Sequence, residues 1–241
     1  MKLAGHQPAY LPYLGVFYKM TQCDKFMFVD HAQFEKKLFQ NRNYVRGRTD
    51  RILLTVPVLT KGRFYQRTDE VLIDNSLPWA RKHWRTISLN YHNAPFFEDH
   101  RGFFEEVYTK ASPRLVDLSL AITHYLMKCF GIEKEVLSSS QCNVTGEKTA
   151  MLIDMCRKAG CDTYVSGWGG KSYVDVEEFR RQGLHHRFVR LAHPVYAQQG
   201  EPFIPNLAAI DLLFNCGPES RRVLNDAAKA STVEEMAPNQ P

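Results

Sequence analysis

The first thirty residues alternate between apolar runs and polar turns in a pattern that predicts a strand, a helix and a second strand. Residues 2–5 form a short apolar run, residues 13–22 are amphipathic, and residues 26–30 are continuously apolar up to a terminal aspartate. Continuous apolar runs are typical of parallel strands that are covered on both faces. We therefore expect a βαβ unit with a right-handed crossover.

The same rhythm returns in the second half of the chain, after a middle region that is mostly helical. A further strand is expected over 52–58, and Pro57 places its far end at an edge. A helix from about 78 to 90 and two helices within 95–130 follow. The second half is expected to contain strands over 135–138, 163–166 and 184–190 and helices over 147–159 and 207–215, which Thr145 and Asn206 cap. This order predicts an α/β fold with a mostly parallel central sheet flanked by helices, the three-layer arrangement of nucleotide-binding proteins. We expect one domain over 1–217 with a helical insert at about 76–131. A C-terminal extension, 218–241, follows, with a polar end that frays from Ser231.

Composition narrows the class of protein. The chain has 241 residues, of which 44% are hydrophobic, and it contains no run of about 18 apolar residues, so no membrane span is expected. The N-terminus lacks the apolar stretch of a secretory signal, and the six cysteines are scattered without a C-x-x-C pair. These features indicate a cytoplasmic protein with reduced, mostly buried thiols. A metal site is not expected, because the adjacent His185 and His186 would point to opposite faces of a strand.

The net charge is +5, and much of the basic excess lies between Lys36 and Arg51. A patch of this kind can bind a phosphate or a nucleotide-sugar, but it is equally typical of a solvated loop. Nucleic acid is not an expected partner, because the block is short and no recognition motif accompanies it.

Two polar side chains follow the first two predicted strands, at the edge where parallel sheets bind ligands. His6 ends the first strand and Asp30 ends the second. If these strands are neighbours, both side chains face the same crevice beyond the carboxyl ends of the strands. His6 is the candidate general base, with Asp30 to orient it. A structural hydrogen bond is the competing interpretation of any single histidine.

A glycine loop after the 163–166 strand is the second candidate feature. Ser166, Gly167, Gly169 and Gly170 lie in a stretch whose backbone N–H groups could hold a phosphate or carboxylate. The glycine spacing matches neither a Walker A loop nor a dinucleotide fingerprint. The alternative is that the three glycines only form a tight turn. Ser166 has half of the context of a nucleophile elbow, which is a weak signal for covalent catalysis.

His193 and Asp211 complete the candidates found by position. His193 follows an extended run and precedes a proline, where it could serve as a second base or form a structural hydrogen bond. Asp211 lies within the apolar helix predicted over 207–215. Its charge is expected either to face solvent or to pair with a basic partner at the site.

Several short motifs occur in order and resemble the WbqC-like family over nearly all of residues 3–217. They are His6-Gln7-Pro8, Leu11-Pro12-Tyr13, Phe39-Gln40-Asn41-Arg42-Asn43, Thr55-Val56-Pro57-Val58, Ser166-Gly167 with Gly170 and Tyr173, His193-Pro194-Val195-Tyr196, and Ile210-Asp211 through Cys216-Gly217. The resemblance implies a bacterial protein encoded in clusters for surface polysaccharide, such as O-antigen, or for specialised metabolites. Such clusters need enzymes that attach acyl or aminoacyl groups to amino sugars.

Two hypotheses follow for function. In the first, the protein is a transferase with His6, Asp30 and His193 in catalysis, and the expected substrate-binding residues are Gln7, Tyr13, Lys36, Asn41, Arg42, Ser166, Gly167, Gly169, Gly170, Tyr173 and Asp211. Its partner would be a phosphate- or carboxylate-bearing small molecule, with a nucleotide or an activated acyl donor in the cofactor role and a homo-oligomer as the possible assembly. In the second, it is a non-catalytic nucleotide- or sugar-binding scaffold of a glycan assembly complex.

The N-terminal layout also resembles that of HIGH-type nucleotidyltransferases. This chain has Pro12-Tyr13-Leu14-Gly15 where those enzymes carry H-x-G-H, so the histidines of adenylyl transfer are missing. The resemblance therefore implies nucleotide binding at an equivalent place without implying that reaction.

Overall fold

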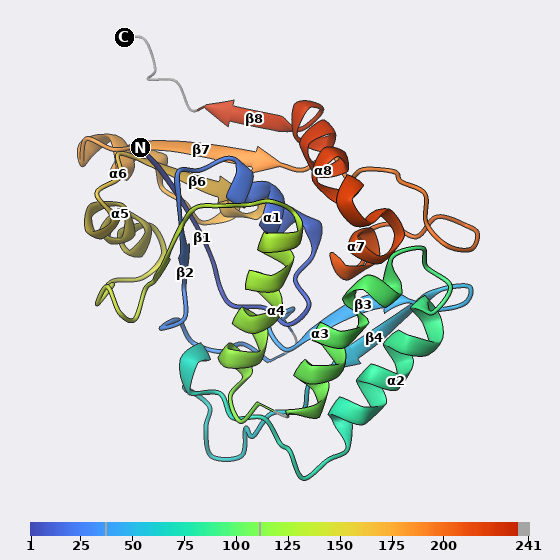
Figure 1. Ribbon diagram of the computed structural model, residues 1–241. Helices are drawn as coiled ribbons and strands as arrows, with labels where there is room; N and C mark the ends of the chain where they lie inside the picture. The colour runs from blue at the N-terminus through green and yellow to red at the C-terminus, as the bar shows by residue number, and fades with distance from the viewer. Residues whose placement is uncertain (37, 111, 236–241) are drawn as a thin grey trace.

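The central element of the fold is a six-stranded sheet in which only the last strand is antiparallel. The computed structural model describes residues 1–36, 38–110 and 112–235. In spatial order the strands are β5 (Glu135–Ser138), β2 (Lys25–Phe28), β1 (Lys2–His6), β6 (Thr163–Gly167), β7 (His185–Arg190) and β8 (Thr232–Glu235) (Figure 1). β1 lies inside the sheet, with β2 on one side and β6 on the other.

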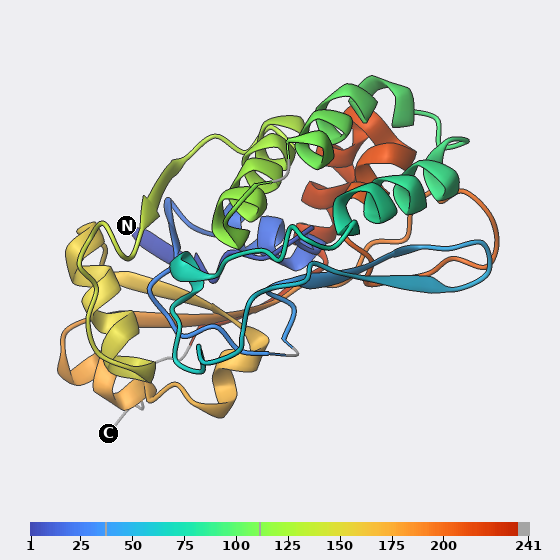
Figure 2. The same ribbon diagram turned by 90° about the horizontal axis from the view of Figure 1, so that it is seen from below.

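Helices cover both faces of this sheet, so the predicted three-layer α/β fold is confirmed. On one side lie α1 (Leu14–Thr21), α2 (Trp79–Tyr91), α3 (Phe97–Thr109), α4 (Leu115–Cys129), α7 (Ile210–Cys216) and α8 (Ser220–Lys229), and on the other lie α5 (Lys148–Ala159) and α6 (Val176–Arg181) (Figure 2). Short 3-10 helices occupy Thr68–Glu70, Trp168–Ser172 and Gly217–Glu219. Successive residues of β1 contribute to two separate cores: Ala4 packs with the side of α1, and Leu3 packs with the side of α5. This alternation is what a strand buried on both faces requires.

The strand predicted over 52–58 does not join the main sheet. It is β4 (Arg51–Thr55), and it pairs with β3 (Arg42–Arg46) in a separate antiparallel hairpin. Only one residue of β4, Leu54, is buried, so the strand has the one-sided burial of a hairpin rather than two covered faces. β3 was not predicted, because its sequence is largely polar and shows no apolar–polar alternation, although Asn43 and Val45 are buried.

The turn between β1 and α1 is held from three directions. The backbone N–H of Tyr10 donates to Gln40 O at 2.8 Å, and the Asn43 side chain donates to Leu11 O at 2.5 Å. Ala209 donates to Pro12 O at 2.9 Å. Leu11 has a φ of 47°, an uncommon value for a leucine that these contacts maintain. The turn is thus a fixed part of the core.

Two predicted helix caps are wrong. α5 starts at Lys148, and Thr145 instead donates from its N–H to Asp154, at 2.8 Å. α7 starts at Ile210, and Asn206 adopts a left-handed conformation with a φ of 59° before it. Cap-type residues also favour turns, which explains both errors.

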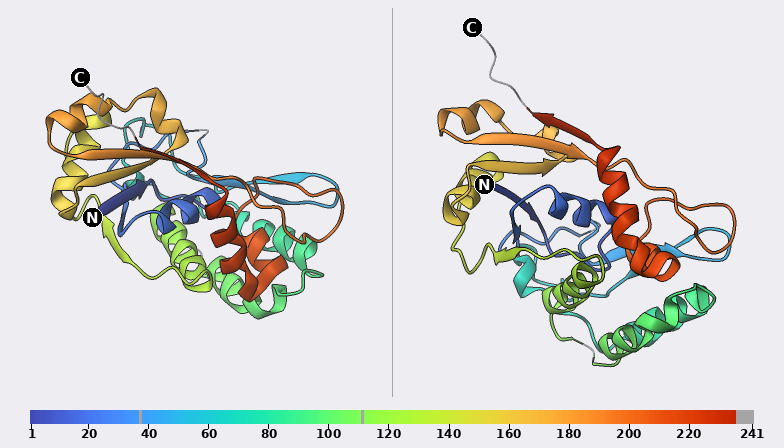
Figure 3. Two further views of the ribbon diagram at one scale, coloured as in Figure 1. Left: turned by 90° about the horizontal axis from the view of Figure 1, so that it is seen from above. Right: turned by 45° about the horizontal axis from the view of Figure 1, so that its top comes forward.

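The end of the chain is more ordered than its composition suggests. α8 contacts α1 and α7, and β8 then pairs with β7 along Arg187–Arg190 (Figure 3). The fraying expected from Ser231 is therefore wrong for residues 232–235, and residues 236–241 lie outside the described part. The domain boundary at 217 and the separate helical insert remain predictions. α2, α3 and α4 contribute to the same buried cluster as α1 and α7.

Within the described residues, no helix combines the length and the apolar character that crossing a bilayer requires.

Phe104 offers a test of the helical side of the core. It is fully buried in α3, and its ring lies 5.3 Å from that of Phe214 and 5.8 Å from that of Tyr125. We expect Phe104→Ala to lower the free energy of unfolding by about 3–5 kcal/mol in urea denaturation, because it leaves a cavity. The control Leu89→Ala, on the exposed face of α2, should change it by less than about 0.5 kcal/mol. Equal losses for the two variants would contradict this packing.

Candidate functional site

Two adjoining cavities open at the carboxyl edge of the sheet, where β1 and β6 lie side by side. At this edge the chain leaves β1 toward α1 and β2 on one face of the sheet, and it leaves β6 toward α6 and β7 on the other face, so the two crossover connections diverge here. Ligands of open parallel sheets bind at such switch points. We call the two cavities the glycine-loop lobe and the aromatic lobe. They meet at Tyr13 and Asn206, which line both.

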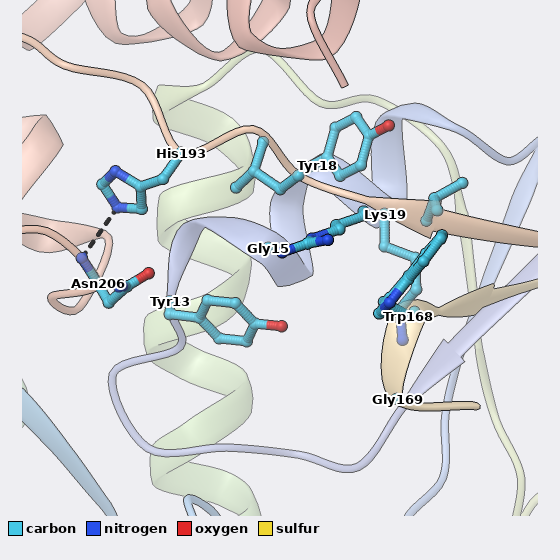
Figure 4. A pocket seen from close by; sticks show the side chains of 12 residues that line it. Tyr13, Gly15, Tyr18, Lys19, Trp168, Gly169, His193 and Asn206 are labelled. Carbon is cyan, nitrogen blue, oxygen red and sulfur yellow. Dashed lines mark hydrogen bonds between the residues drawn. The ribbon is translucent and has the colours of Figure 1, made fainter. Parts of the chain in front are cut away.

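The glycine-loop lobe has a volume of about 250 Å³. Its lining comes from α1 and the residue before it, from the end of β6 with the loop that follows, and from the end of β7 with the segment that follows. The lining residues are Tyr13, Gly15, Tyr18, Lys19, Gly167, Trp168, Gly169, Val189, Arg190, Leu191, His193 and Asn206 (Figure 4). It contains two cationic residues and no Asp or Glu. The Tyr13 hydroxyl points toward the side on which Lys19 and Trp168 lie (Figure 4).

Glycines shape this lobe in two different ways. A Cβ on Gly15 would lie 2.3 Å from the Tyr13 ring, so glycine lets that ring lie across the start of α1. A Cβ on Gly170 would lie 2.9 Å from Cβ of Ser166, so Gly170 serves close packing. Gly167 and Gly169 have no heavy atom within 4 Å of such a position. Gly167 and Gly169 therefore leave the backbone open to a ligand, whereas Gly170 fits the tight-turn interpretation.

Lys19 is the most unusual residue of the glycine-loop lobe. Its side chain is 8% exposed, and its Nζ donates to Gly5 O at 2.5 Å. Among the described residues, no carboxylate pairs with it. Burial lowers its pKa from 10.5 to about 8. This lowering corresponds to a cost of about 3 kcal/mol for keeping the amine charged in the folded protein.

The aromatic lobe is larger, at about 500 Å³, and less polar. Phe39 and Tyr44 form part of its wall, with their ring centroids 6.0 Å apart, and the Arg51 guanidinium lies 4.2 Å from the Tyr44 ring. Gln7 accepts a hydrogen bond from the buried Gln40 side chain at 2.6 Å. An apolar wall with a few fixed polar groups is typical of a small-molecule site.

His6 enters the aromatic lobe from the end of β1. Its Nδ1 lies 2.7 Å from Gln7 O, so Nδ1 carries the proton in the neutral ring and Nε2 keeps its lone pair. No described residue makes a hydrogen bond to Nε2. Burial and the nearby Lys19 charge lower the His6 pKa to about 3, although the bond to Gln7 opposes them. His6 is thus neutral at physiological pH and presents an acceptor nitrogen.

Of the residues predicted from the sequence, the structure brings a subset together at the cleft. Those that line a lobe are His6, Gln7, Tyr13, Gly167, Gly169 and His193. Those that line neither lobe are Asp30, Lys36, Asn41, Arg42, Ser166, Gly170, Tyr173 and Asp211. The roles of all these residues remain proposals, but only those of the first group line the cleft.

Asp30 is bound by serines rather than by His6. Its carboxylate accepts hydrogen bonds from the hydroxyls of Ser138, Ser139 and Ser140 and from the Ser140 N–H, at 2.6–2.8 Å. Burial raises the Asp30 pKa, these bonds lower it, and the net effect is a lowering. The predicted pairing of Asp30 with His6 is therefore not formed. β1 and β2 are neighbours as expected, but the loop after β5 occupies the carboxylate.

Ser166 and His193 both have their polar atoms engaged. Ser166, 4% exposed, lies 2.9 Å from Nε2 of His186, whose pKa burial lowers to about 4. Gly170 packs against Ser166, and neither Ser166 nor His186 lines a lobe. His193 places Nδ1 2.9 Å from Pro194 O, and its Nε2 accepts the N–H of Asn206 at 3.1 Å (Figure 4). The geometry of His193 matches the structural alternative, because both ring nitrogens are used.

Asp211 is fully buried at the start of α7 and organises the segment that carries His193 and Asn206. It accepts hydrogen bonds from Tyr91 at 2.8 Å, Tyr196 at 2.7 Å and Gln198 at 2.6 Å. Burial raises its pKa, despite these bonds and the nearby Arg46. Asp211 thus faces the core. Arg46, the basic residue near it, joins the same buried hydrogen-bond network through Gln198.

The basic block at 36–51 is not a continuous surface patch. Arg46 is 2% exposed and donates to Gln198 and to Pro202 O. Asn41 is buried and donates to Val56 O at 2.8 Å, and Arg42 is partly buried. Lys36 and Tyr173 are exposed away from both lobes.

Sequence reasoning missed Lys19, Arg190 and Asn206 as parts of the cleft. A signal for Lys19 was present: it is a lone charge within the apolar helix run Leu14–Thr21, most of which is buried. Arg190 ends the strand predicted over 184–190, so its strand-end position was also a readable signal. Asn206 gave no comparable signal, because it reaches the cleft only through the path of the chain after β7.

The comparisons with known proteins agree with the motif-based resemblance. The sequence model of the WbqC-like protein family matches residues 7–223. The chain is also 31% identical over 221 residues to "Uncharacterized protein Rv1507c" of Mycobacterium tuberculosis (strain ATCC 25618 / H37Rv), covering 91% of this chain and 95% of the relative. No solved structure matches the chain. The family resemblance drawn from the motifs is confirmed.

Asp30 provides a test of its structural position. We expect Asp30→Ala to lower the free energy of unfolding by about 2–4 kcal/mol at pH 7, because it leaves buried donors unpaired. The stabilisation by the carboxylate is present above its unfolded pKa of 3.8 and is lost as the pH falls through the lowered folded pKa, so the difference should shrink in acid. Asp99→Ala, at an exposed carboxylate, is the control. A normal stability for Asp30→Ala would contradict this assignment.

Lys19 provides a second test, which links its burial to stability. We expect Lys19→Met to raise the free energy of unfolding by about 1–3 kcal/mol at pH 7, because the charged amine is penalised in the folded state. The gain should disappear as the pH rises from about 8 to 10.5, where wild-type Lys19 becomes neutral in both states. His6 and Cys23 are the titratable neighbours, and both stay in place in the variant. A destabilised Lys19→Met protein at pH 7 would show that the amine is structural.

Proposed function

The chain belongs to the WbqC-like protein family, and we propose that it is a transferase that moves an acyl or aminoacyl group from a phosphate-activated donor to an amine or hydroxyl acceptor. The observation that supports this proposal is the pair of adjoining lobes at the carboxyl edge of the sheet. One lobe is cationic and free of acids, and the other is aromatic and holds the His6 acceptor nitrogen.

The two lobes suit the two parts of such a donor. The glycine-loop lobe, with Lys19 and Arg190, would receive the phosphate of the leaving group. The aromatic lobe would take a flat or apolar part of donor or acceptor against Phe39 and Tyr44. Tyr13 and Asn206 stand where the reacting groups would meet, because they line both lobes.

The reaction step uses His6 as the base. The nitrogen or oxygen of the acceptor attacks the acyl carbonyl carbon, and a new C–N or C–O bond forms. The bond from that carbon to the leaving-group oxygen breaks, and the electron pair leaves with the phosphate. The proton of the acceptor passes to Nε2 of His6, which is free of protein partners among the described residues, and then to solvent or the departing phosphate.

The acceptor class comes from the family association rather than from geometry. The WbqC-like resemblance connects the chain with surface-polysaccharide, O-antigen-type, or specialised-metabolite biosynthesis, where amino sugars are acylated. An amino sugar of a nucleotide-sugar or a similar amine is the acceptor that this setting suggests.

A non-catalytic nucleotide- or sugar-binding role is the alternative, and one observation favours it. The His6 pKa of about 3 makes the imidazole a weak base. In that role Nε2 would only accept a hydrogen bond from the ligand.

His6→Gln separates these two functions. Mass spectrometry of small molecules that are retained on the purified protein first supplies the ligand. For a transferase, we expect His6→Gln to reduce kcat about 100-fold or more while the Kd of the ligand changes by less than about threefold. His92→Gln, at an exposed histidine of the α2 end, is the matched control and should retain full turnover. Unchanged kcat in His6→Gln would remove the proposed base, and saturable binding without turnover in any acyl-donor assay would favour the binding protein.

A further inference from the structure

We infer that Lys19 is the anion-binding centre of the glycine-loop lobe and that the group it receives is a phosphoryl group, as a phosphate ester or a diphosphate. The inference deepens the proposed function and rests on it for the location of the donor. It assigns a residue and a ligand class that family membership does not specify.

The first argument is the missing counter-ion. A lysine with 8% exposure that lines a cavity is a buried cation, and buried cations are normally paired with a carboxylate. No described residue supplies one to Lys19. The neighbouring lining residues include Arg190, which also has no acidic partner among the described residues. Arg190 is exposed to solvent, so the buried charge of Lys19 is the one that lacks a compensating anion among the described residues.

The second argument is the way in which Lys19 is anchored. Among the described residues, its ammonium group donates to Gly5 O alone, near the end of β1. An ammonium group has three donors, so two remain for a ligand. A merely structural bond to one carbonyl could be made by a neutral donor, and the charge would then only destabilise the fold.

The third argument is the shape of the lobe. Lys19 shares it with Gly167 and Gly169, and no heavy atom lies within 4 Å of a Cβ position on either glycine. An anion can therefore approach the backbone where β6 ends. The volume of about 250 Å³ suits a phosphate or diphosphate, while the larger organic part belongs in the aromatic lobe.

The charge of the lobe selects between anion classes. Two cationic side chains and no carboxylate match a group that carries two negative charges better than a single carboxylate. This favours a phosphoryl group over a carboxyl group as the anchor of the ligand.

The test measures binding of inorganic phosphate and of pyrophosphate by calorimetry at pH 7 and constant ionic strength, with acetate as the carboxylate comparison. We expect pyrophosphate to bind the wild-type protein, and acetate to bind at least about tenfold more weakly. Lys19→Met should weaken pyrophosphate about 10- to 100-fold, the usual contribution of a charged hydrogen bond. Lys19→Arg, which keeps the charge, should recover a large part of this loss.

The control is Lys82→Met, at an exposed lysine of α2, which should bind pyrophosphate like the wild type. The Lys19→Met protein is first shown to be folded by its thermal unfolding, and Lys19→Gln serves if it is not. Equal pyrophosphate affinity in the wild type and Lys19→Met would overturn the inference and leave the proposed transfer reaction standing. No pyrophosphate binding by the wild type would also overturn the inference. The proposed function fails separately, by unchanged kcat in His6→Gln.

Discussion

The end of β1 is the constraint on which the cleft depends. This strand is central, and Leu3 and Ala4 are fully buried on its opposite faces. A Cβ on Gly5 would lie 2.6 Å from the side chain of Met155 in α5, so the strand and this helix are in close contact. At the same residue the carbonyl oxygen holds Lys19 from α1, and the next residue is His6. One strand end thus fixes the positions of both Lys19 and His6.

The fold around this point buries Lys19 without a carboxylate partner among the described residues, despite the cost. Burial without a carboxylate destabilises the folded protein, and a hydrophobic residue would pack there with less penalty. Other buried charges in the structure are handled differently. Asp30 is surrounded by serine donors, and Asp211 is held by two tyrosines and a glutamine, so both are satisfied within the protein. Lys19 differs from them because it keeps free donors and opens onto a cavity. Residues that violate a stability rule in this way are characteristic of functional sites.

The sequence predicted the central layers well because their signals are local. Short apolar segments identified β1, β2 and β6, strands were also predicted where β5 and β7 lie, and parallel order followed from the alternation of strands with helices. The hairpin of β3 and β4 was missed as a separate unit, since partnership between strands is a non-local property. Position along a strand was a good guide to position in space for His6 and Gly167, which both line the cleft. Asp30 was misjudged because its serine partners arrive from a strand more than one hundred residues later. Lys19, by contrast, carried a readable signal as a charge in an apolar helix.

The two lobes are coupled electrostatically through Lys19 and His6. The charge of Lys19 is one of the causes that lower the His6 pKa, after burial itself. A phosphoryl group bound to Lys19 would offset that charge and add negative charge nearby, and both effects raise the affinity of Nε2 for a proton. His6 would then be a stronger base with the donor bound than without it. This order of events would suit a transferase that must not hydrolyse its donor, because the base gains strength only after the phosphate has filled its lobe. The low His6 pKa, which in isolation favours a passive binding role, is therefore also what a ligand-activated base would show before its ligand arrives.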